Sequence, residues 1–251
     1  MPVCVSEAIV LRTYPLKEAD LIVSFLARDQ GKLRGVAKRA RRPKSGFGAG
    51  LERLSQVRMR YFQRETRELV NLESCELVRS QFGLLSDFEA GVALDYLAEV
   101  TEQSLPPAEP NERWFRLLTA VLDAMQPGGP DCVWRAVTYF TFWAVRLSGY
   151  LPDIDACAVC GAGLGEKAFF GRGCAGLLCE QCRLPLGTGN RRELSALSRA
   201  IAGEMLRKPV GQLSQPGWRQ ETAADLRQFL VQRIESHIER RLVTVPMLEK
   251  A

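Results

Sequence analysis

Residues 31–51 read GKLRGVAKRARRPKSGFGAGL, and this stretch lies within the forty residues from Arg28 to Arg67 around which the chain is organised. Those forty residues hold thirteen lysines and arginines against three acids, a local charge of +10, whereas the whole chain carries +5. The other 211 residues are therefore net acidic, at −5. A concentrated positive block attracts polyanions, and phosphate backbones are the first candidate.

A basic run inside this stretch ends in proline and in the glycine-rich SGFGAG (45–50), which predicts a mobile loop. Downstream, VRMRYFQR (57–64) alternates with the period of a strand, so Val57, Met59 and Tyr61 share one face. The other face is basic and includes Phe62. Cations can follow a phosphate backbone while a ring stacks a base, which contributes about 1–3 kcal/mol per base on single strands.

These residues form the predicted nucleic-acid interface. The alternative is a solvated strand face beside a disordered loop, because basic runs are not specific as motifs. The candidate contacts are Lys32, Arg34, Lys38, Arg39, Arg41, Arg42, Lys44, Arg58, Arg60, Phe62 and Arg64.

The N-terminal third of the chain has a β pattern. Five short segments rich in branched and aromatic residues are separated by Pro, Asp or Gly. They span 4–12, 20–28, 32–40, 56–64 and 68–78. Five strands in so short a segment fit a small barrel, and OB barrels bind oligonucleotides on one face and through adjoining loops. An SH3-like barrel would give a similar pattern, so the strand count leaves the topology open.

Beyond Ser80 the apolar period becomes helical. Ser86 and Glu89 have capping-box spacing for a helix that ends at LPPAEP (105–110). Further helices are predicted at 114–125, 132–147, 194–207 and 218–242, the second of them apolar nearly all round and therefore central. The predicted fold is α+β and multidomain. A small β-barrel domain of the OB type spans 1–80, and an all-helical domain over 81–251 is interrupted by a zinc module at 153–190.

Five of the eight cysteines lie between Cys157 and Cys182, and the N-terminus shows no export signal, so metal binding explains them better than disulfides. CAVC (157–160) and CEQC (179–182) are separated by eighteen residues, a spacing typical of four-cysteine zinc sites. The predicted ligands of one structural Zn²⁺ are Cys157, Cys160, Cys179 and Cys182. Cys174 is a fifth candidate that could replace one of them.

Enzyme motifs are weak in this sequence. The single histidine, His237, forms H-x-E with Glu239, but in the zinc deaminase signature that motif precedes a Pro-Cys pair, whereas here it follows both cysteine pairs. No Walker loop or dinucleotide fingerprint is present. The longest apolar run, 136–145, is too short to span a bilayer. We therefore expect a non-enzymatic, cytoplasmic protein in which His237 is a helix-face residue.

The order of these features resembles a known family. A small β-domain, GKLRGVAKRARRPKSGFGAGL (31–51), a helical domain and GYLPDIDACAVCG (149–161) within it resemble the bacterial RecO family of recombination mediator and DNA repair proteins, over almost the whole chain. The resemblance implies an OB fold that binds single- and double-stranded DNA and anneals complementary strands. It also implies work with RecR and with single-stranded DNA-binding protein, so that RecA can load, in association with the nucleoid and without a membrane.

Two positions depart from the family pattern. Arg39 follows GVAK where Gly is usual, and Arg53 stands where a Pro is common. Both changes add positive charge and bear on the shape of the loop.

Two other functions remain open from the residues alone. In a zinc-ribbon transcription or interaction factor the cysteine module itself would contact the partner. The segment 157–182 has two basic and two acidic residues, so it is neutral and would bind phosphates weakly. An RNA-binding OB protein would use the same basic and aromatic face.

Overall fold

The computed structural model describes residues 3–63, 68–126, 128–184 and 191–250. The chain forms two compact units. The first comprises Met1–Thr119 with Leu242–Ala251, and the second comprises Ala120–Arg241. The domain boundaries inferred from the sequence stay a prediction.

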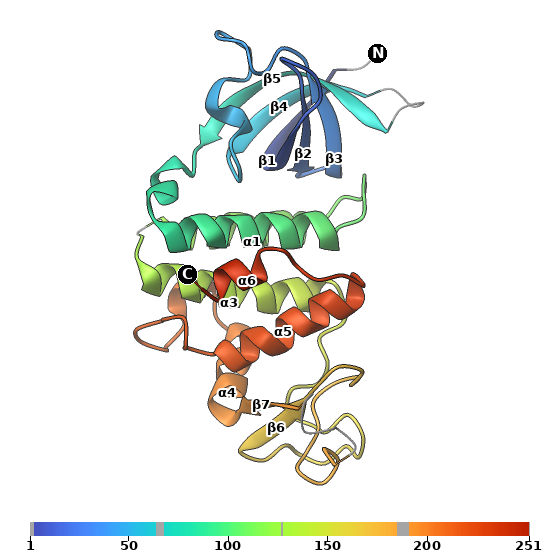
Figure 1. Ribbon diagram of the computed structural model, residues 1–251, viewed down its shortest axis with the longest axis vertical. Coiled ribbons are helices and arrows are strands. Elements are labelled where there is room, and N and C mark those ends of the chain that lie inside the picture. The colour runs from blue at the N-terminus through green and yellow to red at the C-terminus, as the bar shows by residue number, and fades with distance from the viewer. Residues whose placement is uncertain (1–2, 64–67, 127, 185–190, 251) are drawn as a thin grey trace. The chain divides into compact units, whose positions relative to one another are not determined.

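The first unit contains a closed five-stranded barrel (Figure 1). Its strands are β1 (Val3–Pro15), β2 (Leu21–Ala27), β3 (Gly31–Ala37), β4 (Gln56–Phe62) and β5 (Leu69–Arg79). The order around the barrel is β1-β2-β3-β5-β4, with β3 and β5 parallel and the other neighbours antiparallel. This is the arrangement of a five-stranded OB barrel, so that prediction is confirmed and the SH3-like alternative is set aside.

Alternating side chains fill the barrel. Val57, Met59 and Tyr61 of β4 are buried as their period of two predicts, and the Tyr61 ring meets that of Phe25 edge-on with centroids 5.9 Å apart. The glycine-rich segment after the basic run differs from the expected mobile loop. It forms a short 3-10 helix, η1 (Gly48–Leu51), and buries Phe47 in the barrel core. A Cβ at Gly50 would lie 2.5 Å from the Cys75 sulfur, so this close packing requires glycine.

Helices follow the barrel. They are α1 (Phe88–Ser104), α2 (Glu112–Met125), α3 (Pro130–Leu147), α4 (Ala196–Met205), α5 (Ala224–His237) and α6 (Val245–Leu248), with 3-10 turns η2 (Phe82–Ser86) and η4 (Val210–Gln212). The helix over 132–147 is central as predicted, because Trp134, Phe140 and Phe142 are all buried.

Three local predictions about the helices were wrong. The N-cap of α1 is Asp87, whose carboxylate accepts from the Ala90 N–H at 3.0 Å, whereas the Ser86 hydroxyl donates to the carbonyl of Gly83. The last long helix begins at Ala224 rather than at Trp218, whose N–H donates to Asp131 at 2.7 Å. Residues ahead of α4 form a strand, β7 (Arg192–Ser195), antiparallel to β6 (Lys167–Phe170).

Candidate nucleic-acid interface and metal centre

The basic loop, residues 38–44, joins β3 to the segment that buries Phe47 in the barrel core. Its backbone is fixed to the β1–β2 connection, because the Arg39 N–H donates to the Asp20 carboxylate at 2.8 Å and the Arg41 N–H donates to the carbonyl of Ala19 at 3.1 Å. The side chains of all five cations are exposed. Within the described ranges none of the five forms an ion pair, so their charge is directed to solvent. The cations are Lys38, Arg39, Arg41, Arg42 and Lys44.

Two residues of the basic loop adopt a left-handed backbone. Arg39 has φ 55° and Lys44 has φ 62°, a region that glycine occupies at little cost and other residues rarely enter. The departure from the family pattern at Arg39 therefore falls where glycine would fit the backbone better. Arg53 is different, because it pairs with Asp95 of α1. Burial, and then the charge of Arg12, lower the pKa of Arg53.

The outward face of β4 is basic, as its alternation predicts, but its charges are paired. Arg58 contacts Glu76 of β5 at 3.3 Å, and Arg60 contacts Glu73 at 2.6 Å. Phe62 is the last residue of β4 and is partly exposed. Arg64 lies outside the described residues. The charges of Arg58 and Arg60 are thus already neutralised by glutamates.

Lys32 and Arg34, on β3, have different surroundings. The Lys32 ammonium donates to the carbonyl of Glu102 at 2.5 Å, and burial lowers its pKa. Arg34 is exposed, and its guanidinium carbon lies 5.5 Å from the centroid of the Tyr14 ring. Arg34, unlike Lys32, therefore presents an exposed charge, as the cations of the basic loop do. Whether either residue contacts nucleic acid stays a prediction.

Sequence reasoning missed two residues next to Arg34. Arg12 and Tyr14 lie two positions apart on β1, and the Arg12 guanidinium carbon is 5.9 Å from the Tyr14 centroid. Arg12 is exposed and Tyr14 is partly exposed. The two-residue spacing was visible in the sequence, but the approach of Arg34 depends on strand pairing that no local pattern reveals.

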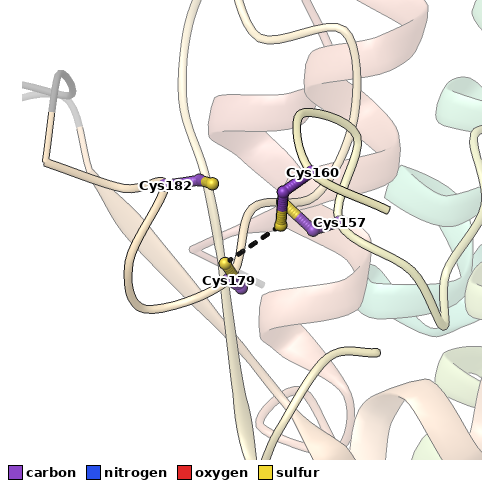
Figure 2. A group of neighbouring side chains, drawn as sticks. All are labelled: Cys157, Cys160, Cys179 and Cys182. Atoms are coloured by element: carbon purple, nitrogen blue, oxygen red, sulfur yellow. Dashed lines mark hydrogen bonds between the residues drawn. The ribbon is translucent and has the colours of Figure 1, made fainter. Parts of the chain in front are cut away.

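The second site is the group of four cysteines predicted as ligands, which the structure brings together. Figure 2 shows Cys157 with Cys160 facing Cys179 and Cys182. The four sulfurs all lie within 4.8 Å of one another, and the Cys160 and Cys179 sulfurs are 3.8 Å apart. Tetrahedral Zn–S bonds of about 2.3 Å place sulfurs about 3.8 Å apart, so this donor set fits such an ion. Cys174 stands outside the set.

The peptide groups around Cys157 favour its thiolate. Burial raises the pKa of the Cys157 thiol, but backbone N–H groups of Cys160, Cys179 and Val159 donate to its sulfur, and together they lower the pKa to about 6. The Cys182 pKa is raised to about 12, because its thiol donates to the sulfurs of Cys160 and Cys179. Cys157 is therefore readily deprotonated and Cys182 keeps its proton, which a divalent cation bound by both sulfurs would displace.

Arginines of the second unit hold the cysteine-bearing segment. Arg199 of α4 donates to the carbonyl of Gly165, and Arg233 of α5 donates to that of Cys174 at 3.0 Å. Phe170 of β6 packs against Phe229 of α5 with centroids 5.2 Å apart. His237 ends α5 and stacks on Tyr150, 4.3 Å between centroids, in keeping with a helix-face residue. The cysteine site is thus built into a helical framework.

A barrel of the OB type, an exposed basic loop and a cluster of four cysteines that could hold a metal ion define the class of protein to which the chain is compared. Two family models match, described as "Recombination protein O N terminal" over residues 1–81 and "Recombination protein O C terminal" over residues 85–245. The chain belongs to the RecO family of DNA repair proteins.

Individual relatives agree with the family models. A DNA repair protein RecO of Koribacter versatilis (strain Ellin345) is 46% identical over 245 residues, which cover 98% of each chain. Another, of Anaeromyxobacter sp. (strain K), is 31% identical over 96% of this chain and 94% of its own. A third, of Cutibacterium acnes, is 32% identical over 81% and 84% respectively. Among the described residues, every helix is too short or too polar to cross a membrane.

Proposed function

We propose that this protein acts without catalysis in recombinational DNA repair, by binding single- and double-stranded DNA and annealing complementary strands. Membership of the RecO family supports the role in repair. The observation that carries the DNA-binding proposal is the basic loop, in which five exposed cations without ion-pair partners among the described residues are fixed beside an OB barrel. Phosphate contacts from such side chains release counterions and supply sequence-independent affinity.

Annealing follows from the same charges. Two complementary strands repel each other through their phosphates, and at physiological salt this repulsion acts over a screening length of about 8 Å. Cations of the basic loop neutralise phosphates of a bound strand and so lower the barrier to its meeting a second one. Because phosphate contacts carry no sequence information, the protein would accept any pair of complementary strands.

The partners in this proposal come from the family resemblance. They are RecR and single-stranded DNA-binding protein, with RecA loaded indirectly on the coated strand at the nucleoid. The four-cysteine site would hold one Zn²⁺ as a structural ion, because four thiolates complete its coordination and leave no open position for chemistry. Cys157, Cys160, Cys179 and Cys182 would then couple ion binding to the folding of their segment.

A zinc-ribbon factor that reads nucleic acid through the cysteine module is less well supported. Lys167 pairs with Glu193 at 2.8 Å and Arg183 pairs with Glu180, so these cations of the module are already engaged. The basic loop has no such partners in the described chain.

A binding and annealing assay tests the proposal. Fluorescence anisotropy with single-stranded DNA, duplex DNA and RNA at two salt concentrations should show salt-dependent binding to both DNA forms. Quenching of a labelled strand by its complement should accelerate when protein is added. Binding to RNA alone would favour the RNA-binding alternative, and the absence of annealing would contradict the proposed role.

A further inference from the structure

One outward row of partly exposed side chains crosses three strands of the barrel. Tyr14 of β1 is in register with Ile22 of β2, and Ile22 is in register with Val36 of β3. All three side chains are partly exposed and apolar or aromatic. They form a continuous strip across β1, β2 and β3, here called the apolar row.

Helix α1 covers the same surface up to the edge of this row. Ile9 and Leu26 are in register and point outward, yet both are fully buried. Ser24 is also fully buried and donates to the Glu102 carboxylate of α1 at 2.5 Å. The side chains of this surface are therefore buried as far as Ser24, and the apolar row lies beyond it.

Cations border the apolar row on both sides. On the side nearer α1, Arg12 and Arg34 flank Ser24 in the strand register, and both guanidiniums approach the Tyr14 ring. Within the part of the chain that the structure describes, neither arginine forms an ion pair. On the other side, Lys38 follows β3 directly and opens the basic loop, which is tied to Asp20 next to β2.

The opposite part of the barrel is arranged differently. The outward arginines of β4, Arg58 and Arg60, pair with glutamates of β5. A strand laid over β4 would have to displace those glutamates, whereas a strand laid over β1–β3 meets cations without carboxylate partners. Charge complementarity therefore favours the surface around Tyr14 for a polyanion.

We propose that unpaired DNA bases stack on Tyr14 along the apolar row, while Arg12 and Arg34 hold phosphates on one side and the basic loop holds them on the other. This inference rests on the proposed DNA-binding function and specifies where single strands are distinguished from duplex. Base–aromatic stacking is tolerant of sequence, since every base has a π face, and paired bases in a duplex cannot use it.

The test compares short oligothymidylate with an abasic oligomer of equal length and charge, by fluorescence anisotropy on the full chain. Tyr14→Ala should weaken binding of oligothymidylate about 5- to 150-fold, the range for loss of one stacked base, and should leave binding of the abasic oligomer within about twofold. Tyr14→Phe should keep wild-type affinity for both. Tyr14→Leu, which retains apolar bulk in the row, should behave like Tyr14→Ala.

Charge variants separate this inference from the proposed function. The double variant Arg12→Gln with Arg34→Gln should weaken the binding of both oligomers equally. It should also reduce the slope of log affinity against log salt by about 0.7 for each phosphate contact that is lost. If Tyr14→Leu and Tyr14→Ala bind oligothymidylate as the wild type does, or lose both oligomers equally, stacking at Tyr14 is overturned. If the wild type itself shows no salt-dependent binding to either oligomer, the proposed function fails and not merely its location.

Discussion

Substitutions of Arg39 should separate protein stability from DNA binding. Its φ of 55° lies in the left-handed region, its side chain is exposed, and its N–H is held by Asp20. A residue other than glycine in that region costs the folded protein about 1–2 kcal/mol of stability. Glycine instead costs about 0.4–1 kcal/mol of stability, because it has more conformational freedom in the unfolded chain. Arg39→Gly should therefore be about 1 kcal/mol more stable than Arg39→Ala.

The two variants remove the same charge, so they should bind DNA equally. Each should reduce the slope of log affinity against log salt by about 0.7 for single strands and about 0.9 for duplex. Arg39→Lys keeps the charge and the strained backbone, and should retain the wild-type slope. Thermal melting should place Arg39→Gly about 2–4 °C above Arg39→Ala.

Two results would refute this reasoning separately. Equal melting temperatures of Arg39→Gly and Arg39→Ala would show that the left-handed backbone carries no cost. A wild-type salt slope in both variants would show that Arg39 makes no phosphate contact.

Two further predictions concern the metal site and the barrel. Metal analysis should find one zinc per chain in the wild type and in Cys174→Ser, but little in Cys157→Ser or Cys182→Ser. The two ligand variants should also melt at a lower temperature than the wild type. Unchanged melting temperatures in both would contradict a structural ion. Phe47→Ala should lower the free energy of unfolding by about 3–5 kcal/mol, because it empties part of the barrel core, whereas exposed Phe82→Ala should change it by less than about 0.5 kcal/mol. Urea denaturation followed by circular dichroism measures both, and equal effects would contradict the packing of Phe47.

The strands of the barrel were predictable because the pattern that identifies each strand lies within its own residues. Alternation of Val57, Met59 and Tyr61 with basic residues identifies a strand with one buried face, and Gly, Pro and Asp mark the connections. The cysteine spacing likewise predicted which four residues lie together, since a C-x2-C pair is a local turn and only two such pairs had to meet. That the cluster forms is confirmed by its sulfur distances.

What was missed depends on contacts between distant segments. The glutamates that pair with Arg58 and Arg60 lie on β5, and only the register of β4 with β5 identifies them. Arg34 reaches Tyr14 across an intervening strand. Phe47 looked like part of a mobile glycine-rich loop, because its neighbours favour turns, while its burial is decided by its packing against side chains of the barrel core.

The salt dependence of DNA binding tests the central claim most directly. A variant with Lys38, Arg39, Arg41, Arg42 and Lys44 all changed to Ala should keep its circular dichroism spectrum, since these side chains are exposed. Its salt slope should fall by up to about 3.5 for single strands and about 4.5 for duplex, with nearly equal loss of affinity across DNA sequences and slower annealing. A folded five-alanine variant that binds and anneals single strands with wild-type affinity and wild-type slope would contradict the account.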